Sequence, residues 1–305
     1  MRRPRIVIIT GPTASGKSRL AHILARETGG EIINADSLQV FRGMDIGTAK
    51  PSQEERAEVP YHLLDIRNPD EPFDAFSFRE EAMKVIGDLH RRGIPVLVVG
   101  GTGLYLRVLE RGLFPAPRAD GRLREVWKKE AESKGPHVLW ERLKAVDPTA
   151  AVRIHPNDIF RIIRALEVWE LTGRPMTAWQ RWGQETTAEL ETLWIGLALE
   201  REDLYRRINR RTEEMMAQGF LEEVRGLLER GYGPDLKPMQ SLGYRHLVEV
   251  IQKGRPLAEA VEEIKRDTRR YAKRQMTWLK KEEKIRWFSP EEFDRIRREM
   301  NKFYL

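Results

Sequence analysis

The feature that most constrains this chain is the stretch TGPTASGKS, residues 10–18, which follows an apolar run and opens a helical pattern. It matches G-x-x-x-x-G-K-[ST] in the strand-loop-helix context in which such loops bind phosphate groups. Its glycines permit a tight turn, and the backbone N–H groups that follow can line an anion nest at the helix N-terminus. We therefore predict a phosphate-binding loop formed by Gly11, Thr13, Ala14, Ser15, Gly16, Lys17 and Ser18.

Two side chains of this loop have predicted roles of their own. The Lys17 ammonium neutralises the outer phosphate, and the Ser18 hydroxyl coordinates Mg²⁺. The motif names a class of ligand and no reaction, because kinases, GTPases, motors and group transferases share it. A nucleotide such as ATP is therefore an alternative occupant, and the rest of the chain must identify the reaction.

Strand-like and helix-like segments alternate over most of the chain. Short apolar runs rich in β-branched residues predict buried parallel strands at Arg5–Thr10, Glu31–Ala35, Pro95–Gly100 and Leu193–Leu199. Helical patterns are found at Lys17–Thr28, Ser77–Arg92, Thr102–Arg111, Arg201–Arg230 and Leu257–Lys281. This alternation predicts an α/β fold, a doubly wound parallel sheet of the P-loop type, with C-terminal helices.

The alternation is interrupted between residues 115 and 185. Leu123–Trp182 has the pattern of three or four amphipathic helices without a convincing strand, and it holds five of the eight tryptophans. Large apolar side chains build cores, so we expect these tryptophans to pack inside and not to stack on bases. We predict a helical insertion domain, residues 115–185, in a core domain made of residues 1–114 and 186–305.

The chain is basic, with a formal net charge of +7 and a pI near 9.6. Its most biased segment has eight Lys or Arg between Lys265 and Lys281 against the single Asp267. Such a helix favours a polyanionic partner, since its cations displace the counterions of phosphates; a generally basic surface is the alternative. Tyr271 and Trp278 recur at helical spacing and are expected in the buried seam of this helix.

The cellular environment is indicated by what the sequence lacks. Cysteine is absent, which excludes disulfides and thiolate metal sites and suits a reducing compartment. Only five apolar residues precede the loop, too few for a signal peptide, and no apolar stretch reaches membrane-spanning length. We expect a cytoplasmic protein with no membrane association.

Two strand ends carry polar residues at the sheet edge where ligands of open α/β folds bind. Asp36 ends the second strand and is predicted to act as a general base or to support Mg²⁺; a local cap through Ser37 is the alternative. Thr102 lies in the glycine turn after the third strand and offers a hydroxyl to the cleft; a plain turn is the alternative. No acidic residue ends that strand in Walker B fashion, which argues against an ATPase motor or a GTPase.

Further polar residues are candidates for ligand contacts. Asn157, Arg161 and Arg164 share one face of a helical pattern in the insertion, which suits phosphate or base contacts; a solvated face is the alternative. Gln39 carries an amide that reads a base edge or is solvated. One member of an arginine cluster near the start of a later helix is expected to reach the phosphate loop: Arg207, Arg210 or Arg211.

Seven segments, in this order, resemble the bacterial tRNA dimethylallyltransferases: GPTASGKS, NADSLQVFRGMDIGTAKP, GGTGLYL, NDIFRIIRALE, RINRRTEEMMAQGFLEEV, SLGYRHL and TRRYAKRQMTWLK. The resemblance spans about Ile6 to Trp287, with Phe41 where tyrosine is frequent and TWLK for the more usual TWFR. It implies transfer of a dimethylallyl group from dimethylallyl diphosphate to N6 of the adenosine immediately 3′ of the tRNA anticodon. The loop would then bind the diphosphate of the donor, which is the leaving group.

The resemblance also implies roles for single residues. Asp36 accepts a proton from N6, and Thr102 positions the amine. Lys17, Arg211 and Mg²⁺ on Ser18 stabilise the departing diphosphate. Contacts with the tRNA are implied for Asp36, Ser37, Leu38, Gln39, Thr102, Arg124, Asn157, Arg161, Arg164, and for Tyr244 and Arg245 of a GYR turn. The expected partners are the anticodon loop of tRNA and dimethylallyl diphosphate, bound by a monomer that needs no protein partner.

Two other functions fit part of the pattern. A small-molecule P-loop kinase, or an adenylate isopentenyltransferase acting on free nucleotide, would share the loop and Asp36 but would leave the basic helix without a polyanion. A non-catalytic, nucleotide-regulated RNA-binding module would not need the Asp36 carboxylate. Comparing activity toward free AMP and toward tRNA separates the first of these from a tRNA-modifying enzyme.

Overall fold

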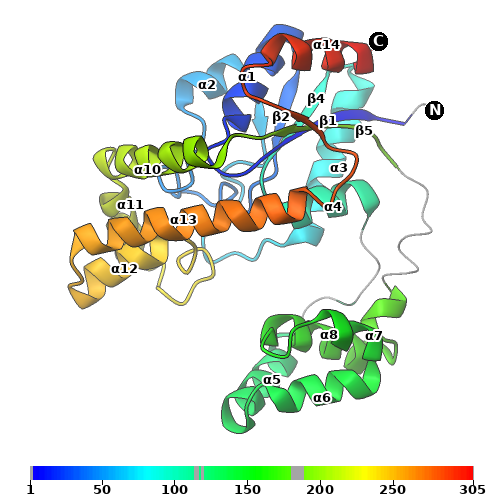
Figure 1. Ribbon diagram of the computed structural model, residues 1–305, viewed down its shortest axis with the longest axis vertical. Helices are drawn as coiled ribbons and strands as arrows, with labels where there is room; N and C mark the ends of the chain where they lie inside the picture. The colour runs from blue at the N-terminus through cyan, green and yellow to red at the C-terminus, as the bar shows by residue number, and fades with distance from the viewer. Residues whose placement is uncertain (1–2, 113–116, 118–119, 180–188, 305) are drawn as a thin grey trace. The chain divides into compact units, whose positions relative to one another are not determined.

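The computed structural model describes residues 3–112, 117, 120–179 and 189–304. The chain forms two compact units, one of Met1–Glu110 with Glu189–Leu305 and one of Arg111–Ala188 (Figure 1). We call them the sheet unit and the helical unit. No helix within the described ranges is long and apolar enough to cross a membrane.

The sheet unit is built on parallel strands in the order β3-β2-β4-β1-β5-β6. The strands are β1 (Arg5–Thr10), β2 (Glu31–Asn34), β3 (Tyr61–His62), β4 (Val96–Val99), β5 (Glu191–Leu197) and β6 (Arg286–Phe288). In the centre, Ile8 of β1 pairs with Val98 on one side and with Trp194 on the other. The predicted α/β fold is confirmed. The sequence patterns missed β3 and β6, because strands of two and three residues are too short to show a period.

The helices of the sheet unit follow the strands in the alternating order of a doubly wound fold. They are α1 (Lys17–Thr28), α2 (Gln53–Glu58), α3 (Ala75–Arg91), α4 (Gly103–Arg111), α10 (Arg201–Ala217), α11 (Phe220–Glu229), α12 (Tyr244–Lys253), α13 (Leu257–Leu279) and α14 (Phe293–Tyr304). Three of these, α2, α12 and α14, were not among the predicted elements. Beyond the sheet, α10 and α12 both pack against the long α13 (Figure 1).

The single helix predicted over Arg201–Arg230 is wrong, because the structure divides it into α10 and α11. The break is at Gly219, whose φ of 98° lies in the left-handed region that glycine adopts without steric cost. The Gly219 N–H bonds to the Met216 carbonyl, which closes α10, and the same residue is the N-cap of α11. Because the charge pattern continues through Gly219, the break was not predicted from the sequence.

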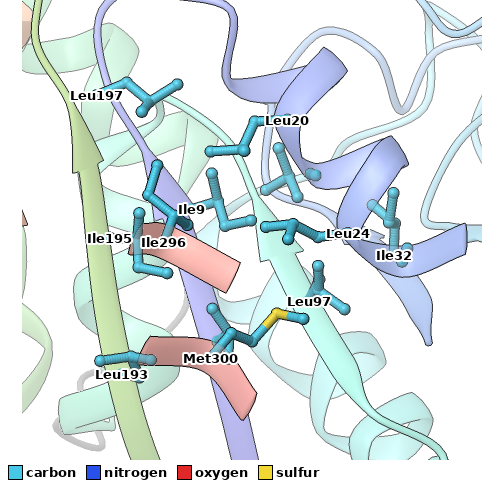
Figure 2. Close-up of a cluster of buried hydrophobic side chains, with 14 of the residues drawn as sticks. Ile9, Leu20, Leu24, Ile32, Leu97, Leu193, Ile195, Leu197, Ile296 and Met300 are labelled. Atoms are coloured by element: carbon cyan, nitrogen blue, oxygen red, sulfur yellow. The ribbon is translucent and has the colours of Figure 1, made fainter. Parts of the chain in front are cut away.

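The main core lies on the face of the sheet that α1 and α14 cover. Figure 2 shows its side chains: Ile9, Leu20, Leu24, Ile32, Leu97, Leu193, Ile195, Leu197, Ile296 and Met300. Ile6 and Ile8 are equally buried but alternate to the opposite face, so β1 has apolar contacts on both sides. A strand buried on both faces is held firmly, and its end therefore gives the phosphate loop a rigid base.

The helical unit contains α5 (Gly121–Lys134), α6 (His137–Val146), α7 (Pro148–Arg153) and α8 (Ile159–Thr172). It has a core of its own, formed by Trp127, Ala131, Leu139, Leu143, Ala150, Ala151, Ile154, Ile162, Ile163, Ala165 and Leu166. Trp140 packs at the edge of this core, so the expected role of the tryptophans is confirmed for Trp127 and Trp140. Trp182 lies outside the described residues.

The predicted buried seam of α13 is wrong at Tyr271, which is 37% exposed. The buried positions are Ala260, Ile264, Lys265, Ala272, Gln275 and Leu279. Residue 271 lies next to this stripe, about 100° around the helix from residue 272. Trp278 is half-buried, and its ring lies against Gly103 at the start of α4. The seam prediction followed the aromatic residues, whereas the small Ala272 and the polar Gln275 occupy the contact.

Helix α14 contributes buried side chains to the core in Figure 2, so we expect this helix to be needed for stability. Met300→Ala removes a fully buried side chain and leaves a cavity, so we expect a loss of about 2–5 kcal/mol in the free energy of unfolding. Urea denaturation followed by circular dichroism measures it. Asn301→Ala, one residue away and exposed, is the matched control and should change little. Equal stability of the two variants would contradict the assignment of α14 to the core.

Candidate active site at the carboxyl edge of the sheet

The loop between β1 and α1 has the backbone geometry of an anion nest. The φ angles of Gly11, Ala14 and Gly16 are 153°, 63° and 94°. Gly16 is the N-cap of α1, and no side chain caps the helix there. The N–H groups of the first helical turn therefore stay available, and they carry the positive end of the helix dipole. An anion would accept hydrogen bonds from these N–H groups and would also be attracted by the helix dipole.

Lys17 carries a perturbed amine in this loop. Burial, followed by repulsion from Arg211, lowers the pKa of Lys17 to about 8, and the Asp36 carboxylate opposes the shift. The Nζ atom donates to the Pro12 carbonyl at 3.3 Å. The ammonium thus lies folded over the loop, where an anion would relieve its repulsion with the guanidinium.

Helix α10 brings two of the three clustered arginines to this loop. Arg207 lies against Gly16, where a Cβ would be 3.8 Å from its Nη1 atom. Arg211 is one helical turn further; burial lowers its pKa, and Asp36 counteracts this. Arg211 makes no hydrogen bond or short ion pair with any residue in the described part of the chain. Arg210 instead bonds Glu214 at 2.7 Å and is exposed.

Asp36 lies just beyond β2, as the sequence predicts. Its Oδ1 atom accepts from the Leu38 N–H at 2.9 Å, and its own N–H donates to Asn34 Oδ1 at 3.2 Å. The local cap considered from the sequence therefore exists, but through Leu38 and not through Ser37. Oδ2 has no hydrogen bond to a described residue and is available as a proton acceptor. The carboxylate acts electrostatically on Lys17 and Arg211, which places it in the same site.

Thr102 joins the loops that follow β2 and β4. Its Oγ1 atom accepts from the Ser37 N–H at 3.2 Å, so the hydroxyl hydrogen is still free to donate. Ser37 is therefore held through its backbone, directly beside Asp36. The two polar strand ends that the sequence singled out are in contact.

Gln275 of α13 completes this frame and was not found from the sequence. Its Oε1 atom accepts from the Thr13 N–H at 2.9 Å, and its Nε2 atom donates to the Gly101 carbonyl at 3.0 Å. The side chain is buried, and a Cβ on residue 101 would overlap its amide. One amide thus links the phosphate loop to the glycine turn that carries Thr102. The only sequence signal was a polar residue on the apolar stripe of α13.

The segment after Asp36 is held by side chains that the sequence analysis assigned elsewhere or missed. Gln39 Nε2 donates to the Thr48 and Ala49 carbonyls at 2.9 and 3.2 Å, so this amide supports a turn in the structure. Glu223 of α11 accepts from the backbone N–H groups of Asp45, Ile46 and Gly47 and from the Tyr244 hydroxyl, at 2.8, 2.6, 3.1 and 2.6 Å. A carboxylate satisfying four donors fixes this segment firmly.

The GYR residues occupy a helix start and not the expected turn. Tyr244 begins α12, after the N-cap Gly243. It is fully buried, with its hydroxyl on Glu223, so a contact with tRNA would require this segment to open. Arg245 is exposed and pairs with Asp267 at 2.7 Å.

The helical unit, taken by itself, presents the remaining candidates near the start of α8. Asn157 is exposed and precedes the N-cap Asp158, and Arg161 pairs with that carboxylate at 3.1 Å. Arg124 and Arg164 both bond the buried carboxylate of Glu167. This cluster of two guanidiniums and one carboxylate has a net positive charge.

The cations of α13 divide into two groups. Those of its first part pair within the protein: Lys265 with Glu213 and Glu262, Arg266 with Glu263, Arg269 with Asn209, and Arg270 with Asp267. Those near its end are exposed and have no ion pair within the described ranges: Lys273, Arg274, Lys280 and Lys281. The surface predicted to bind a polyanion is therefore concentrated at the C-terminal end of the helix.

The described residues contain no group of three or more His, Asp or Glu that could hold a metal ion. A Mg²⁺ that bridges a bound diphosphate needs only one or two protein oxygens, because phosphates and water supply the rest. Ser18, exposed at the start of α1, offers such an oxygen next to the anion nest. The donor set fits a magnesium ion carried by the ligand.

Comparison with known proteins gives a consistent result over the whole chain. The family model described as IPP transferase matches residues 39–282, and the model described as Isopentenyl transferase matches residues 4–72. A tRNA dimethylallyltransferase of Geobacter metallireducens is 51% identical over 303 residues, 99% of this chain and 98% of that protein. The Geobacter sulfurreducens protein of the same name is 50% identical, covering 99% and 97%.

Solved structures agree in fold. A tRNA isopentenylpyrophosphate transferase from Bacillus halodurans superposes with a TM-score of 0.72 at 37% identity, over 99% of this chain and 97% of that one. A eukaryotic dimethylallyltransferase described as acting on tRNA superposes with a TM-score of 0.78 at 30% identity, over 93% of this chain and 73% of that chain.

The lowered pKa of Lys17 predicts that diphosphate binding weakens as the pH rises through about 8. Below that pH the ammonium is charged and attracts the anion; above it the amine is neutral, and each pH unit costs up to about tenfold in affinity. Calorimetric titration with inorganic diphosphate across this range measures the profile. Lys17→Met should bind weakly and follow only the titration of the ligand, whereas parallel profiles for the two proteins would exclude Lys17 as the titrating group.

In the ligand-free protein the same shift acts against stability. The folded-state pKa lies below the unfolded value of 10.5, so the charged amine costs about 3 kcal/mol below about pH 8, and this cost disappears as the pH rises toward 10.5. Lys17→Met should therefore raise the free energy of unfolding at neutral pH while it weakens diphosphate binding.

The bridge made by Gln275 predicts a shared loss of stability and binding. Gln275→Leu leaves the Thr13 N–H and the Gly101 carbonyl without partners, at about 1–3 kcal/mol for each group, and loosens the loop that holds the anion. Urea denaturation and diphosphate titration measure both effects. The control is Gln252→Leu on the exposed surface of α12, which should alter neither. Full diphosphate affinity in the Gln275 variant would show that the bridge does not order the loop.

Proposed function

The chain belongs to the IPP transferase family, and on this premise we propose that it transfers a dimethylallyl group from dimethylallyl diphosphate to N6 of the adenosine immediately 3′ of a tRNA anticodon. The observation that carries the proposal is the meeting of an anion nest with the Asp36 carboxylate and the Thr102 hydroxyl at one sheet edge. A diphosphate leaving group and an amine nucleophile need these two kinds of group side by side.

The leaving group is served by the phosphate loop. As the C1–O bond of the donor breaks, negative charge grows on the diphosphate oxygens. The loop N–H groups, the Lys17 ammonium and the Arg211 guanidinium are preorganised around that charge, so little reorganisation is needed when the bond breaks. Ser18 would hold Mg²⁺, which would supply further charge neutralisation when bound.

The nucleophile is served by the opposite side of the site. The N6 lone pair forms the new bond to C1, and one N6 proton passes to Asp36 through its free Oδ2 atom. Thr102 has a hydroxyl hydrogen and a remaining lone pair with which to hold the amine. The adenine has to leave its stack to reach this edge, as in other enzymes that act on a base. The products are the N6-dimethylallyl adenosine and diphosphate.

The tRNA would bind through phosphate contacts with exposed cations. Lys273 and Arg274 lie on the same helix as Gln275, which bonds the phosphate loop, and Lys280 and Lys281 follow directly after its end. A polyanion on this helix is thereby brought to the element that frames the site.

We further propose that the protein works as a monomer in the cytoplasm, where its tRNA substrate is found and where a chain without cysteine needs no oxidising conditions.

The rival acceptor is a free adenylate, which a related prenyltransferase could modify with the same loop and Asp36. Purified protein, Mg²⁺ and radiolabelled dimethylallyl diphosphate are incubated with an unmodified tRNA or with AMP, and the nucleosides are separated after digestion. Label on N6-(dimethylallyl)adenosine from tRNA alone supports the proposal. Label from AMP alone would replace it by the nucleotide enzyme.

The role of Asp36 gives a further test. Asp36→Asn keeps the size of the side chain and the acceptor for the Leu38 N–H but removes the base, so we expect single-turnover transfer to fall by at least ~10²-fold. The affinity for tRNA should stay close to that of the wild type. Asp70→Asn, an exposed carboxylate, is the control and should leave transfer unchanged. Undiminished transfer by the Asp36 variant would remove this residue from proton transfer.

A further inference from the structure

Asn34 carries a buried amide that the proposed reaction does not use. It is the last residue of β2, two positions before Asp36, and it is only 6% exposed. A buried amide needs partners for both its oxygen and its nitrogen, because an unsatisfied polar group in the interior costs free energy. The partners of Asn34 therefore indicate its role.

The two ends of the Asn34 amide bond groups of opposite polarity. Its Oδ1 atom accepts from the Asp36 N–H at 3.2 Å. Its Nδ2 atom donates to the Asp36 carbonyl at 3.4 Å and to the Leu63 carbonyl at 3.2 Å. Exchanging the two ends would set N–H against N–H and oxygen against oxygen, so the amide has one favourable orientation. One side chain thus binds the peptide groups on both sides of the Asp36 α-carbon.

The residue between Asn34 and Asp36 is held by the neighbouring strand. The Ala35 N–H donates to the Val99 carbonyl at 2.7 Å. Gly100 packs directly on Ala35, since a Cβ on residue 100 would lie 2.2 Å from the Ala35 carbonyl oxygen. The sheet therefore fixes the chain as far as Ala35, and the Asn34 amide extends that constraint across Asp36.

The Leu63 carbonyl belongs to a strained segment beside this turn. Leu63 and Asp65 have φ angles of 62° and 54°, in the left-handed region that residues other than glycine seldom adopt. Such backbone persists only where its surroundings hold it, and it gathers at functional sites. Two contacts that hold it are the bond from Asn34 to Leu63 and a bond from the Asp65 N–H to the Gln39 carbonyl at 3.4 Å. Both join the strained segment to the chain around Asp36.

Proton transfer depends on where the Asp36 carboxylate lies. Its Oδ1 atom is engaged by the Leu38 N–H, which leaves Oδ2 to take the proton. An acceptor has to lie within about 3 Å of the atom that gives up the proton, so an α-carbon that shifts carries Oδ2 out of reach. A misplacement of about 1 Å is enough to cost ~10²-fold in rate.

We propose that Asn34 is a positioning residue for the transfer reaction, which holds the Asp36 backbone so that Oδ2 stays within reach of the N6 amine. The inference rests on the proposed function, because it takes Asp36 as the proton acceptor. Asn34 touches no reacting atom and acts through Asp36. Its effect on the rate must therefore disappear once residue 36 can no longer accept a proton.

A double-mutant cycle tests this dependence. Single-turnover transfer at saturating tRNA and dimethylallyl diphosphate is measured for Asn34→Ala, for Asp36→Asn and for the two combined. Asn34→Ala should lower the rate by ~10-fold alone and by less than about twofold in the presence of Asp36→Asn, with the affinity for tRNA unchanged. Asn34→Ser should give an intermediate rate, because a serine hydroxyl can accept from the N–H two residues further on. A ~10-fold loss in both backgrounds, or no loss in either, would overturn the proposal.

Met300→Ala controls for a simple loss of stability, because it removes a fully buried side chain of α14 and leaves the contacts of Asp36 intact. Its effect on the rate should be small and equal in both backgrounds.

Hydrogen exchange of the peptide covering residues 33–40 supplies a readout that needs no transfer. Asn34→Ala should speed exchange there relative to the peptide that covers β1, whereas Met300→Ala should affect the two peptides alike. Equal exchange of residues 33–40 in the wild type and in Asn34→Ala would overturn the positioning role. Faster exchange in Asn34→Ala, from a protein whose wild type transfers no label to tRNA, would overturn the proposed function while the hold of Asn34 on this segment stands.

Discussion

The ammonium of Lys17, held half-buried beside the Arg211 guanidinium, is the interaction around which the rest of the site is organised. Two cations in a partly desolvated place repel one another, and one carboxylate, Asp36, only partly compensates. The arrangement costs free energy until an anion arrives, so the protein must hold both cations in place by other means. A loop free to relax would separate them.

Those other means are buried hydrogen bonds between loops that are far apart in the sequence. Gln275 links Thr13 to Gly101, and Thr102 takes the N–H of Ser37. Because each loop follows a strand buried on both faces, a bond between two loops transmits the rigidity of the sheet to the site. Helix α13 is part of this frame through Gln275 and carries exposed cations near its end, which joins polyanion binding to the geometry of the loops.

Much of this could be predicted from the sequence, and the reasons for success and failure are physical. Residues 11–18, Asp36 and Thr102 were placed correctly at one sheet edge, since parallel strands bring their carboxyl ends together. Gln275 could not be placed, because its partner Thr13 is 262 residues away and an amide carries no local signal. Tyr271 was assigned to the seam of α13 on its hydrophobicity, although the small Ala272 fits the close packing.

The chain carries two kinds of cation, those buried at the phosphate loop and those exposed near the end of α13. Arg211 is costly where it lies, and such groups are retained where they meet a ligand that repays the cost. Lys280 and Lys281 are solvated and cost nothing, but each holds a polyanion only weakly and is screened by salt. A small, highly charged leaving group needs the first kind, because only a few contacts can be made to its concentrated charge. A long RNA can use many of the second kind, and its specificity must then come from contacts that read shape or bases, since phosphate contacts carry no sequence information.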